Sequence, residues 1–162
     1  MRRVLLLALG LVLCGAVSSP LAPGLAAQTK PAANAATHEG HDMEKMLVAF
    51  ADAWNRHDVD ALMSFMTPDG VFEASGGNTV NGERYEGAQA VRAAYAAVFT
   101  TYADARWNNA RHFVAGDRGC SEWLLTGTSV DGARIEVRGC DLFAFRGGLI
   151  VRKDSYWKIV EP

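Results

Sequence analysis

A long run of strand-forming residues in the last third of the chain constrains the fold more than any other feature. Residues 139–145 and 149–157 are rich in aromatic and β-branched side chains, and only Arg146-Gly147-Gly148 separates them. Two such runs joined by a short glycine-containing turn predict a β-hairpin. Asp141 falls among aromatic side chains that a sheet would bury. Because a buried carboxylate is costly unless it is paired, protonated or hydrogen-bonded, Asp141 is the first candidate for a functional site.

The N-terminus is typical of an export signal. Two arginines precede an apolar run over residues 4–17, and small residues follow it. We therefore expect a signal peptide over residues 1–27 and a periplasmic or secreted product. The run is shorter than the roughly 20 residues that a membrane-spanning helix needs, so no membrane span is expected. Two variants of the signal stay open. The arginine pair faintly resembles a twin-arginine signal. The apolar run ending at Cys14 faintly resembles a lipoprotein signal, although such a signal has a small residue where Leu13 stands.

The charge balance is mildly acidic. The chain carries a formal net charge of −2, and removing Arg2 and Arg3 with the signal, without any acidic residue, changes −2 to −4. No basic stripe is present in the sequence, which argues against nucleic-acid binding. The sequence also holds no phosphate-binding loop, Ser-His-Asp order or zinc ligand set, so no cofactor and no metal are expected.

The remaining chain divides into a linker and one domain. Residues 28–41 are rich in Ala, Pro, Thr and Asn and predict a flexible linker. His38 and His41 within it lack the spacing of a helical zinc motif and are read as solvated. Residues 42–162 are long enough for a single domain.

Hydrophobic periodicity orders the elements of this domain. Helical spacing begins after Asp42, a candidate N-cap, and turn residues 67–70 interrupt the pattern. The expected helices are 43–54, 59–66 and 89–102, and the expected strands are 71–74, 84–86, 105–116, 119–127, 133–145 and 149–158. Helices followed by a meander of strands predict an α+β fold with helices on one face of a curved, mainly antiparallel sheet. Such a sheet encloses a cone-shaped cavity.

Turn chemistry predicts which side chains share the cavity. A two-residue Asp131-Gly132 turn sets Glu122 opposite Asp141, and Cys120 opposite Phe143. Two carboxylates facing one another repel unless one is protonated or a cation is near. The same register directs Cys140 to the other face, so no disulfide is expected, although another register would allow one.

The turn at residues 146–148 decides which residue of the last strand faces Asp141, and two registers are possible. A three-residue turn at 146–148 sets Lys153 opposite Asp141, which makes Glu122, Asp141 and Lys153 the candidate catalytic group. A two-residue turn sets Asp154 opposite Asp141 instead, with Arg152 and Tyr156 on the same face. In a third reading these charges form only a structural network over the sheet.

Aromatic side chains supply the candidate walls of the cavity. The residues expected to contact a ligand are Trp54, Phe50, Tyr95, Phe143 and His112. Pocket linings are mostly apolar and aromatic, but the same residues also suit a plain hydrophobic core.

Three segments carry a resemblance to a known family. They are Phe50-Ala51-Asp52-Ala53-Trp54-Asn55-Arg56-His57-Asp58-Val59-Asp60-Ala61-Leu62, Asp69-Gly70-Val71-Phe72 and Gly139-Cys140-Asp141-Leu142-Phe143-Ala144-Phe145. Together they resemble the SnoaL-like domain of the nuclear transport factor 2 (NTF2-like) superfamily, over about residues 43–160. The resemblance implies a cone-shaped fold with three N-terminal helices on the sheet. It also implies a homodimer through the outer sheet face, where we place Trp123, Leu125 and Leu142.

The resemblance extends to ketosteroid isomerase, but only one of its site residues carries over. Asp141 matches the acid of that enzyme whose apolar surroundings keep it protonated, so that it donates a hydrogen bond to the oxyanion. Ala74 stands at the position of its general base and Phe50 at that of its oxyanion tyrosine. Ser155 stands at the position of an acid in limonene epoxide hydrolase. The sequence therefore argues against both of these reactions.

The function expected from the sequence is binding of a small, largely apolar or carbonyl-containing molecule in the cavity. Acid/base chemistry of the isomerase, cyclase or hydratase type would use Asp141 as a raised-pKa acid, Glu122 as its partner or base, and Lys153 to set their charge. Whether the protein is an enzyme stays open. The alternative is a non-catalytic homodimeric binding or assembly module.

Overall fold

Helices precede a meander of long strands, as the sequence predicts, in a computed structural model that describes residues 32–160. The helices are α1 (Ala32–Asn55), α2 (Val59–Ser64) and α3 (Ala88–Thr101), and the strands are β1 (Met66–Glu73), β2 (Arg84–Glu86), β3 (Arg106–Ala115), β4 (Arg118–Thr128), β5 (Arg134–Arg146) and β6 (Leu149–Trp157). The expected α+β class is confirmed.

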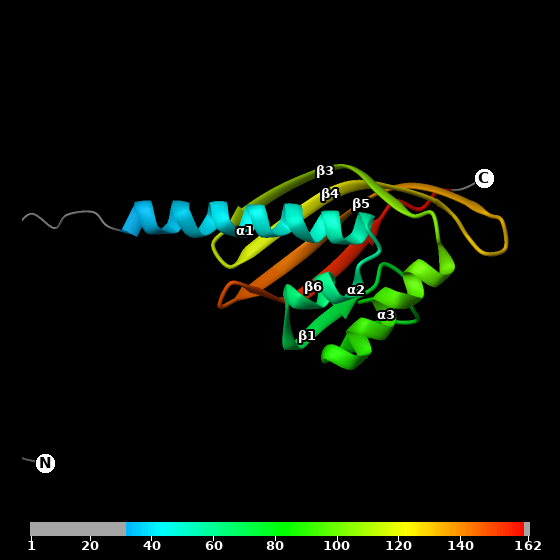
Figure 1. Ribbon diagram of the computed structural model, residues 1–162, viewed down its shortest axis with the longest axis horizontal. Helices are drawn as coiled ribbons and strands as arrows, with labels where there is room; N and C mark the ends of the chain where they lie inside the picture. Colours follow the sequence, from blue (N-terminus) through cyan, green and yellow to red (C-terminus); the bar gives the residue numbers. More distant parts are fainter. Residues whose placement is uncertain (1–31, 161–162) are drawn as a thin grey trace, which may run out of the picture. The chain divides into compact units, whose positions relative to one another are not determined.

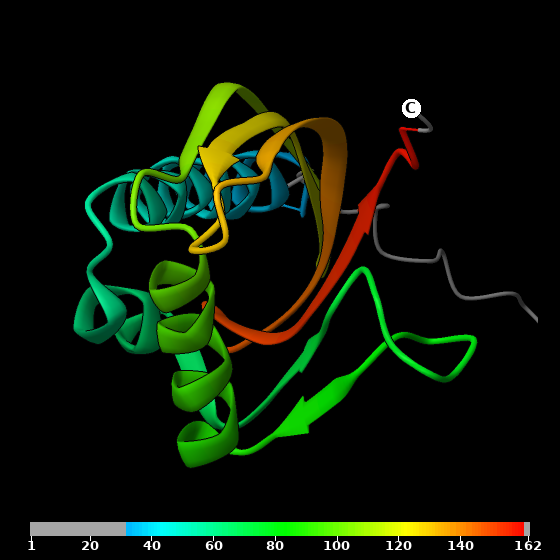
Figure 2. The ribbon, with the colours of Figure 1, turned by 90° about the vertical axis from the view of Figure 1, so that its right-hand side faces the viewer.

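The described strands form one sheet in the order β2-β1-β6-β5-β4-β3. Every pairing is antiparallel except that of β1 with β6, which is parallel. Figure 1 shows the helices on one side of the sheet, and Figure 2 shows the strands curving around that side. The helices therefore cover the concave face, with α1 packed against β3 and α3 against β1.

The hydrophobic core lies between the helices and the concave face. On α1 the buried side chains recur at helical spacing, as Leu47, Phe50 and Trp54. Phe50 is central, because its ring makes edge-to-face contacts with four other aromatic rings. These partners are Trp54, Phe65, Tyr95 and Phe143.

Two element boundaries differ from the expectation. Helix α1 begins at Ala32, so part of the expected linker is helical and Asp42 lies inside the helix rather than at its N-cap. Residues 67–70, expected as a turn, belong to β1, where the pairing with β6 is irregular between Met66 and Val71. The expected signal peptide lies outside the described residues. Within the described part of the chain, no helix is long and apolar enough to cross a membrane.

The register between β4 and β5 differs by one residue from the prediction. Asp141 pairs with Ser121, and Glu122 pairs with Cys140. The reason is the loop: the Ser129 amide donates to the Ala133 carbonyl oxygen, and the Gly132 amide to that of Ser129. The loop thus holds three residues, with Gly132 in the left-handed conformation at a φ of 88°, a common alternative to the two-residue turn. One extra loop residue moves Glu122 to the opposite face.

The register between β5 and β6 matches neither sequence alternative. Gly147 and Gly148 form a two-residue turn, both with positive φ. Val151 is then an extra residue, because Phe145 pairs with Ile150 whereas Ala144 pairs with Arg152. This bulge sets Ser155 opposite Asp141 and Lys153 opposite Phe143.

Candidate ligand-binding site

Four polar side chains from three adjacent strands meet on the concave face of the sheet. Trp123 comes from β4, Asp141 from β5, and Lys153 and Ser155 from β6. Alternation along each strand directs them inward, between aromatic residues. All four are buried, and Lys153 and Asp141 are only 5% and 6% exposed.

The Asp141 carboxyl group accepts three hydrogen bonds. Its Oδ1 lies 2.7 Å from Lys153 Nζ and 2.6 Å from Ser155 Oγ, and its Oδ2 accepts from the Trp123 indole at 3.0 Å. Ser155 Oγ in turn accepts from Lys153 Nζ at 2.6 Å. Because every partner is a donor and one is a cation, the arrangement stabilises an ionised carboxylate. The protonated, proton-donating Asp141 expected from the sequence stays a prediction.

Lys153 is the cation of the site. Its Nζ lies 4.8 Å from the centre of the Phe72 ring and 5.5 Å from that of the Trp54 ring, distances at which a cation is attracted to an aromatic face. An ammonium group has three protons, and Asp141 and Ser155 receive two of them. The third proton has no hydrogen-bond acceptor among the described residues.

A cavity of about 240 Å³ opens beside this cluster. It lies between α3, the β1–β2 edge and the concave face, and its lining residues are Trp54, Phe72, Ala74, Ser75, Tyr85, Ala94, Ala97, Val98, Thr101, Tyr102, Trp107, Trp123, Leu125, Lys153, Ser155 and Trp157. All four tryptophans of the chain are among them. Lys153 is the only charged side chain in this lining. The Trp54 indole nitrogen is buried and has no hydrogen-bond partner among the described residues.

The expected contact residues separate into three groups. Trp54 lies between the main cavity and a neighbouring void of about 20 Å³ and lines both, whereas Phe50, Phe143 and His112 line only the void, which also touches Asp141. Tyr95 lies on neither wall; it is fully buried, and its hydroxyl is 3.7 Å from Met66 Sδ. Burial, with a smaller contribution from the Asp141 charge, raises the pKa of Tyr95 well above its ordinary value.

His112 is half-buried beside the void. Its Nδ1 lies 2.7 Å from Ser121 Oγ. Burial lowers the pKa of His112, and the charges of Glu44, Asp52 and Asp141 oppose this shift only in part. The neutral imidazole is therefore favoured in the folded protein.

Three polar groups of the site are not among those predicted from the sequence: the Ser155 hydroxyl, the Trp123 indole and the unpaired Trp54 N–H. Alternation gives a signal for Ser155, which must share the face of Lys153 two residues earlier. Trp123 was misplaced by the one-residue register error. The Trp54 N–H carries no signal in a sequence, because its lack of a partner depends on packing.

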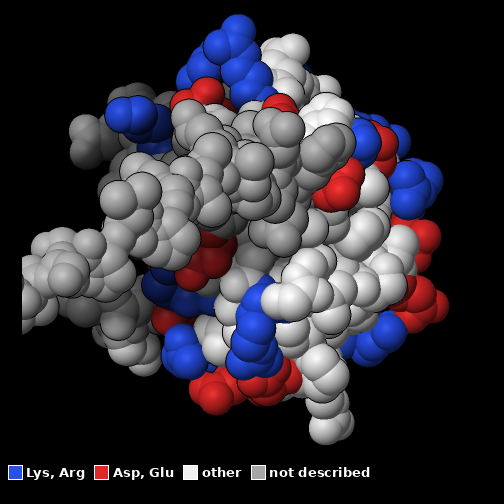
Figure 3. Space-filling view, turned by 90° about the vertical axis from the view of Figure 1, so that its left-hand side faces the viewer, with Lys and Arg blue, Asp and Glu red and all other residues white. Residues whose placement is uncertain are grey.

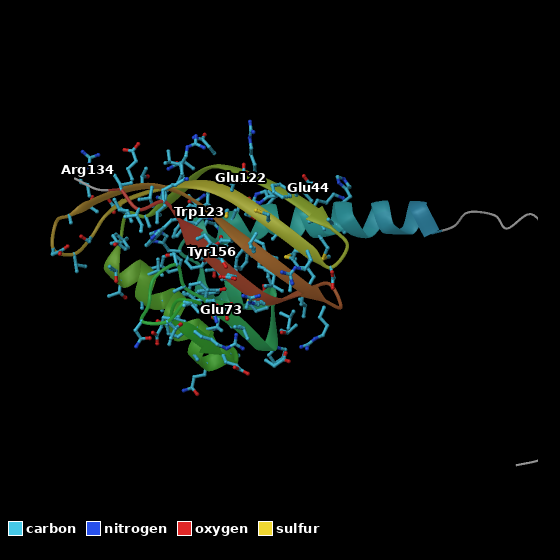
Figure 4. All side chains as sticks on the ribbon, turned by 180° about the vertical axis from the view of Figure 1, so that it is seen from behind. Glu44, Glu73, Glu122, Trp123, Arg134 and Tyr156 are labelled. Carbon is cyan, nitrogen blue, oxygen red and sulfur yellow. The ribbon has the colours of Figure 1, made fainter. Side chains whose placement is uncertain are left out.

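The outer face of the sheet holds residues that the sequence placed inside. Glu122 is exposed there, so it does not contact Asp141 and the expected pair of acids is not formed. Conversely, Trp123 and Leu125 are buried on the inner face, and of the three expected dimer residues only Leu142 lies outside. Figure 4 views the molecule from the side opposite Figure 1, with Glu122 and Tyr156 labelled on β4 and β6.

The two cysteines also share the outer face, contrary to the predicted register. Cys120 pairs with Leu142 and Cys140 with Glu122, and both thiols are free. Burial raises the pKa of Cys120 to about 11 and raises that of Cys140 as well.

A separate charge network covers the other end of the outer face. Glu73 is 4% exposed and accepts from Arg84 Nη1 at 2.8 Å and from Arg152 Nε at 2.6 Å. Arg152 Nη2 also donates to Asp154 at 2.6 Å. The Tyr156 hydroxyl donates to Asp154 at 2.9 Å, so Arg152, Asp154 and Tyr156 form a network outside the cavity, not within it as the second register required.

Charges of both signs are interspersed on the face drawn in Figure 3, with no stripe of one sign. Within residues 32–160, no group of three His, Cys, Asp or Glu side chains is placed to hold a metal ion.

Comparison with known proteins settles the family. The family model for the SnoaL-like domain matches residues 47–153. The chain belongs to the SnoaL-like family. Its sequence matches no curated protein at significant similarity.

Solved structures show the same NTF2-like fold. A candidate polyketide cyclase from Xanthomonas campestris is 20% identical with a TM-score of 0.66, over 74% of this chain and 93% of that one. An NTF2-like protein of unknown function from Mesorhizobium loti is 27% identical with a TM-score of 0.61, over 75% of this chain and 94% of that one. A protein with a ketosteroid isomerase-like fold from Catenulispora acidiphila, solved with trimethylamine, is 19% identical with a TM-score of 0.62, over 70% of this chain and 85% of that one.

Proposed function

We propose that this SnoaL-like protein binds a small, largely apolar molecule bearing a carbonyl oxygen, with the oxygen directed to Lys153. The observation that carries the proposal is the buried ammonium group of Lys153 on an otherwise uncharged, mostly apolar wall. Asp141 and Ser155 hold two of its protons, and the third is free to meet an acceptor from the cavity.

The charge of the site favours a neutral ligand. Asp141 lies 2.7 Å from Lys153 and neutralises it, so a full negative charge on the ligand would meet no net positive charge. A carbonyl oxygen needs only hydrogen-bond donors. Trp54 lies on the same wall, and its buried N–H has no partner among the described residues, which is costly. The cavity of about 240 Å³ limits the ligand to a small molecule.

If the bound molecule reacts, Lys153 is the acid of the site. Its ammonium proton can stabilise negative charge that develops on the carbonyl oxygen, as in an enolisation or ring closure. Asp141 then acts as a positioning residue that orients Lys153 and balances its charge. This assignment replaces the sequence-based one, in which Asp141 donated the proton and Glu122 assisted.

Ligand titration followed by tryptophan fluorescence tests the proposal, because all four tryptophans line the cavity. We expect acetophenone to bind more tightly than ethylbenzene, which has a similar shape and no oxygen. Replacing Ala97, which lines the cavity, by Phe should weaken acetophenone binding at least about tenfold, a loss near 1.4 kcal/mol. The matched variant Ala96→Phe, on the same exposed stretch of α3 but outside the cavity lining, should bind like wild type. Equal affinity for the two compounds would refute the role of the carbonyl oxygen.

The outer face supports a second candidate function, a homodimeric module. Phe113 and Leu142 are 55% and 39% exposed, and they flank Cys120 in one row across β3, β4 and β5. Tyr156 on β6 is also exposed nearby. Exposed apolar side chains gathered on one face are typical of an interaction surface. We propose that a second copy of the chain covers it, which is compatible with ligand binding in the cavity on the other face.

Export remains a proposal that the sequence alone supports. The signal-like residues 1–27 suggest a periplasmic or secreted mature product. N-terminal sequencing of the protein produced in its own host should give a start close to Gln28. An intact Met1 terminus would contradict export by this signal.

A further inference from the structure

The structure gives Lys153 the setting of a nucleophilic amine as well as that of a hydrogen-bond donor. Lys153 lines the cavity and is 5% exposed as a residue, and its Nζ has the Phe72 and Trp54 rings and the Asp141 carboxylate as neighbours. Lysines in dry, apolar pockets are the ones that attack carbonyl carbons to form Schiff bases. Neither the family match nor the structural neighbours assign such a role.

We propose that Lys153 forms a Schiff base with a small aldehyde or ketone bound in the cavity. This proposal rests on the proposed function, since the carbonyl group must first be held beside Lys153. It goes further, because it assigns a covalent step to a specific nitrogen.

Asp141 is placed to manage the protons of this step. The Lys153 ammonium first passes one proton to Asp141 Oδ1, 2.7 Å away, which leaves a neutral amine. The amine lone pair attacks the carbonyl carbon, so the C–N bond forms as the C=O double bond opens. A second proton of the nitrogen then moves to the oxygen, with the Ser155 hydroxyl, 2.6 Å from Nζ, as the adjacent relay.

Loss of water completes the step. Asp141 returns its proton to the hydroxyl group of the intermediate, the C–O bond breaks, and a protonated imine remains on Lys153. The nitrogen has lost two protons, and both leave with the carbonyl oxygen as water, so no oxidant or reductant is needed. Asp141 is again a carboxylate and faces the positive charge of the imine, as it faces the ammonium in the free protein.

The rest of the site fits the product. The imine nitrogen keeps its cationic charge near the faces of Phe72 and Trp54. The Trp123 indole holds the other oxygen of Asp141 at 3.0 Å, which keeps the carboxylate aligned during proton transfer. The cavity walls around the imine are mostly apolar.

Trapping with a reductant tests the proposal on the wild-type protein. The chain has only four lysines, and Lys45 and Lys158 are exposed, so they serve as internal controls for non-specific reaction. The protein is incubated with benzaldehyde and cyanoborohydride, which reduces an imine to a stable benzylamine, and the modified lysine is mapped by peptide mass spectrometry. We expect Lys153 to be modified roughly tenfold or more over Lys45 and Lys158, because the cavity holds the aldehyde against it. Excess benzyl alcohol, which has no carbonyl group, should suppress this labelling.

Two variants separate the chemistry from binding. Lys153→Arg keeps a positive charge beside Asp141 but cannot form an imine, so it should lose the site-specific adduct. Ser155→Ala removes the proton relay and should slow adduct formation at Lys153 while leaving the labelling of Lys45 unchanged.

The outcomes distinguish this proposal from the proposed function. In one outcome, tryptophan fluorescence shows that benzaldehyde binds, but the exposed Lys45 and Lys158 are labelled more than Lys153. This result would overturn the Schiff base and leave carbonyl binding intact. Failure of both benzaldehyde and acetophenone to bind would overturn the proposed function, and the Schiff base with it. A dominant adduct at Lys153 supports both.

Discussion

Asp141 and Lys153 depend on one another. Each is about one-twentieth exposed, and the 2.7 Å contact between them is the only salt bridge that either makes among the described residues. Removing one partner of a buried ion pair leaves an uncompensated charge, whereas replacing both with apolar or neutral groups is far better tolerated.

The single variant Asp141→Asn should therefore lose about 3–5 kcal/mol of unfolding free energy. The double variant Asp141→Asn/Lys153→Met should lose clearly less, because the unpaired ammonium is gone. Urea unfolding of the wild type, both single variants and the double variant completes a double-mutant cycle. Additive losses would show that the two groups do not stabilise one another.

His112 gives the protein a dependence of stability on pH. Its pKa is lowered by burial from an ordinary value of 6.5, so below that value the unfolded chain binds a proton that the folded protein resists. The contribution is fully present above about pH 6.5 and is lost as the pH falls through the lowered pKa of the folded state.

We expect His112→Gln to reduce the loss of stability between pH 7.5 and about pH 5.5, since Gln does not titrate. Denaturant unfolding of wild type and variant at several pH values measures this difference. Parallel pH profiles for the two proteins would assign the effect to other groups.

A glycine on β5 allows Trp123 to reach Asp141. A Cβ atom at Gly139 would lie 2.2 Å from the Trp123 ring and 2.4 Å from the Tyr156 carbonyl oxygen, both closer than side chains allow. The indole therefore crosses the neighbouring strand at the one residue that leaves room for it. This fixes the donor on Asp141 Oδ2.

Gly139→Ala should displace Trp123, remove its hydrogen bond and cost about 1–3 kcal/mol of stability. Gly40→Ala is the matched control, because nothing lies within 4 Å of a Cβ there, and it should be neutral or slightly stabilising in α1. Thermal unfolding and tryptophan fluorescence follow both variants. An unshifted melting temperature for Gly139→Ala would mean that the strands adjust without moving the indole.

The elements themselves were predictable, and their registers were not. Hydrophobic periodicity and turn residues placed β3 to β6 and α3 within one or two residues of their observed bounds. These rules failed where a single extra residue changes which face of the sheet a side chain occupies. The loop before Ala133 has three residues instead of two, which moves Glu122 to the outer face. The extra residue Val151 sets Ser155 opposite Asp141. Neither feature has a sequence signature as strong as the glycine turns beside it, because bulges are set by the curvature of the whole sheet.

The site was therefore predicted in part. Asp141 and Lys153 share the inner face in the structure, although as diagonal rather than opposite neighbours. The sequence suggested them because charged residues between aromatic ones must find partners.

At the level of the whole molecule, the two faces of the sheet carry different tasks. The concave face holds the cavity, and the outer face holds exposed Phe113, Leu142 and Tyr156. If a second copy covers the outer face, the dimer forms without closing the cavity on the other side.

Size-exclusion chromatography with light scattering should give the mass of a dimer for the wild type. Leu142→Arg should shift the protein to a monomer, because it places a charge in the centre of the proposed interface. Val130→Arg, at an exposed loop position outside the outer-face row, should leave the dimer unchanged. A wild-type monomer at high concentration would refute the interface, and the ligand experiments would still stand.

The extra residue at Val151 sets the chemical identity of the pocket. With a regular ladder after the Gly147-Gly148 turn, Asp154 would stand opposite Asp141, and Lys153 would point away. Straightening the bulge while Val151 is retained would thus exchange a basic interior for an acidic one, whereas deleting Val151 would remove the bulge and keep Ser155 opposite Asp141. A designer who wants a flatter sheet here must therefore shorten the strand by one residue, or the interior charge is inverted.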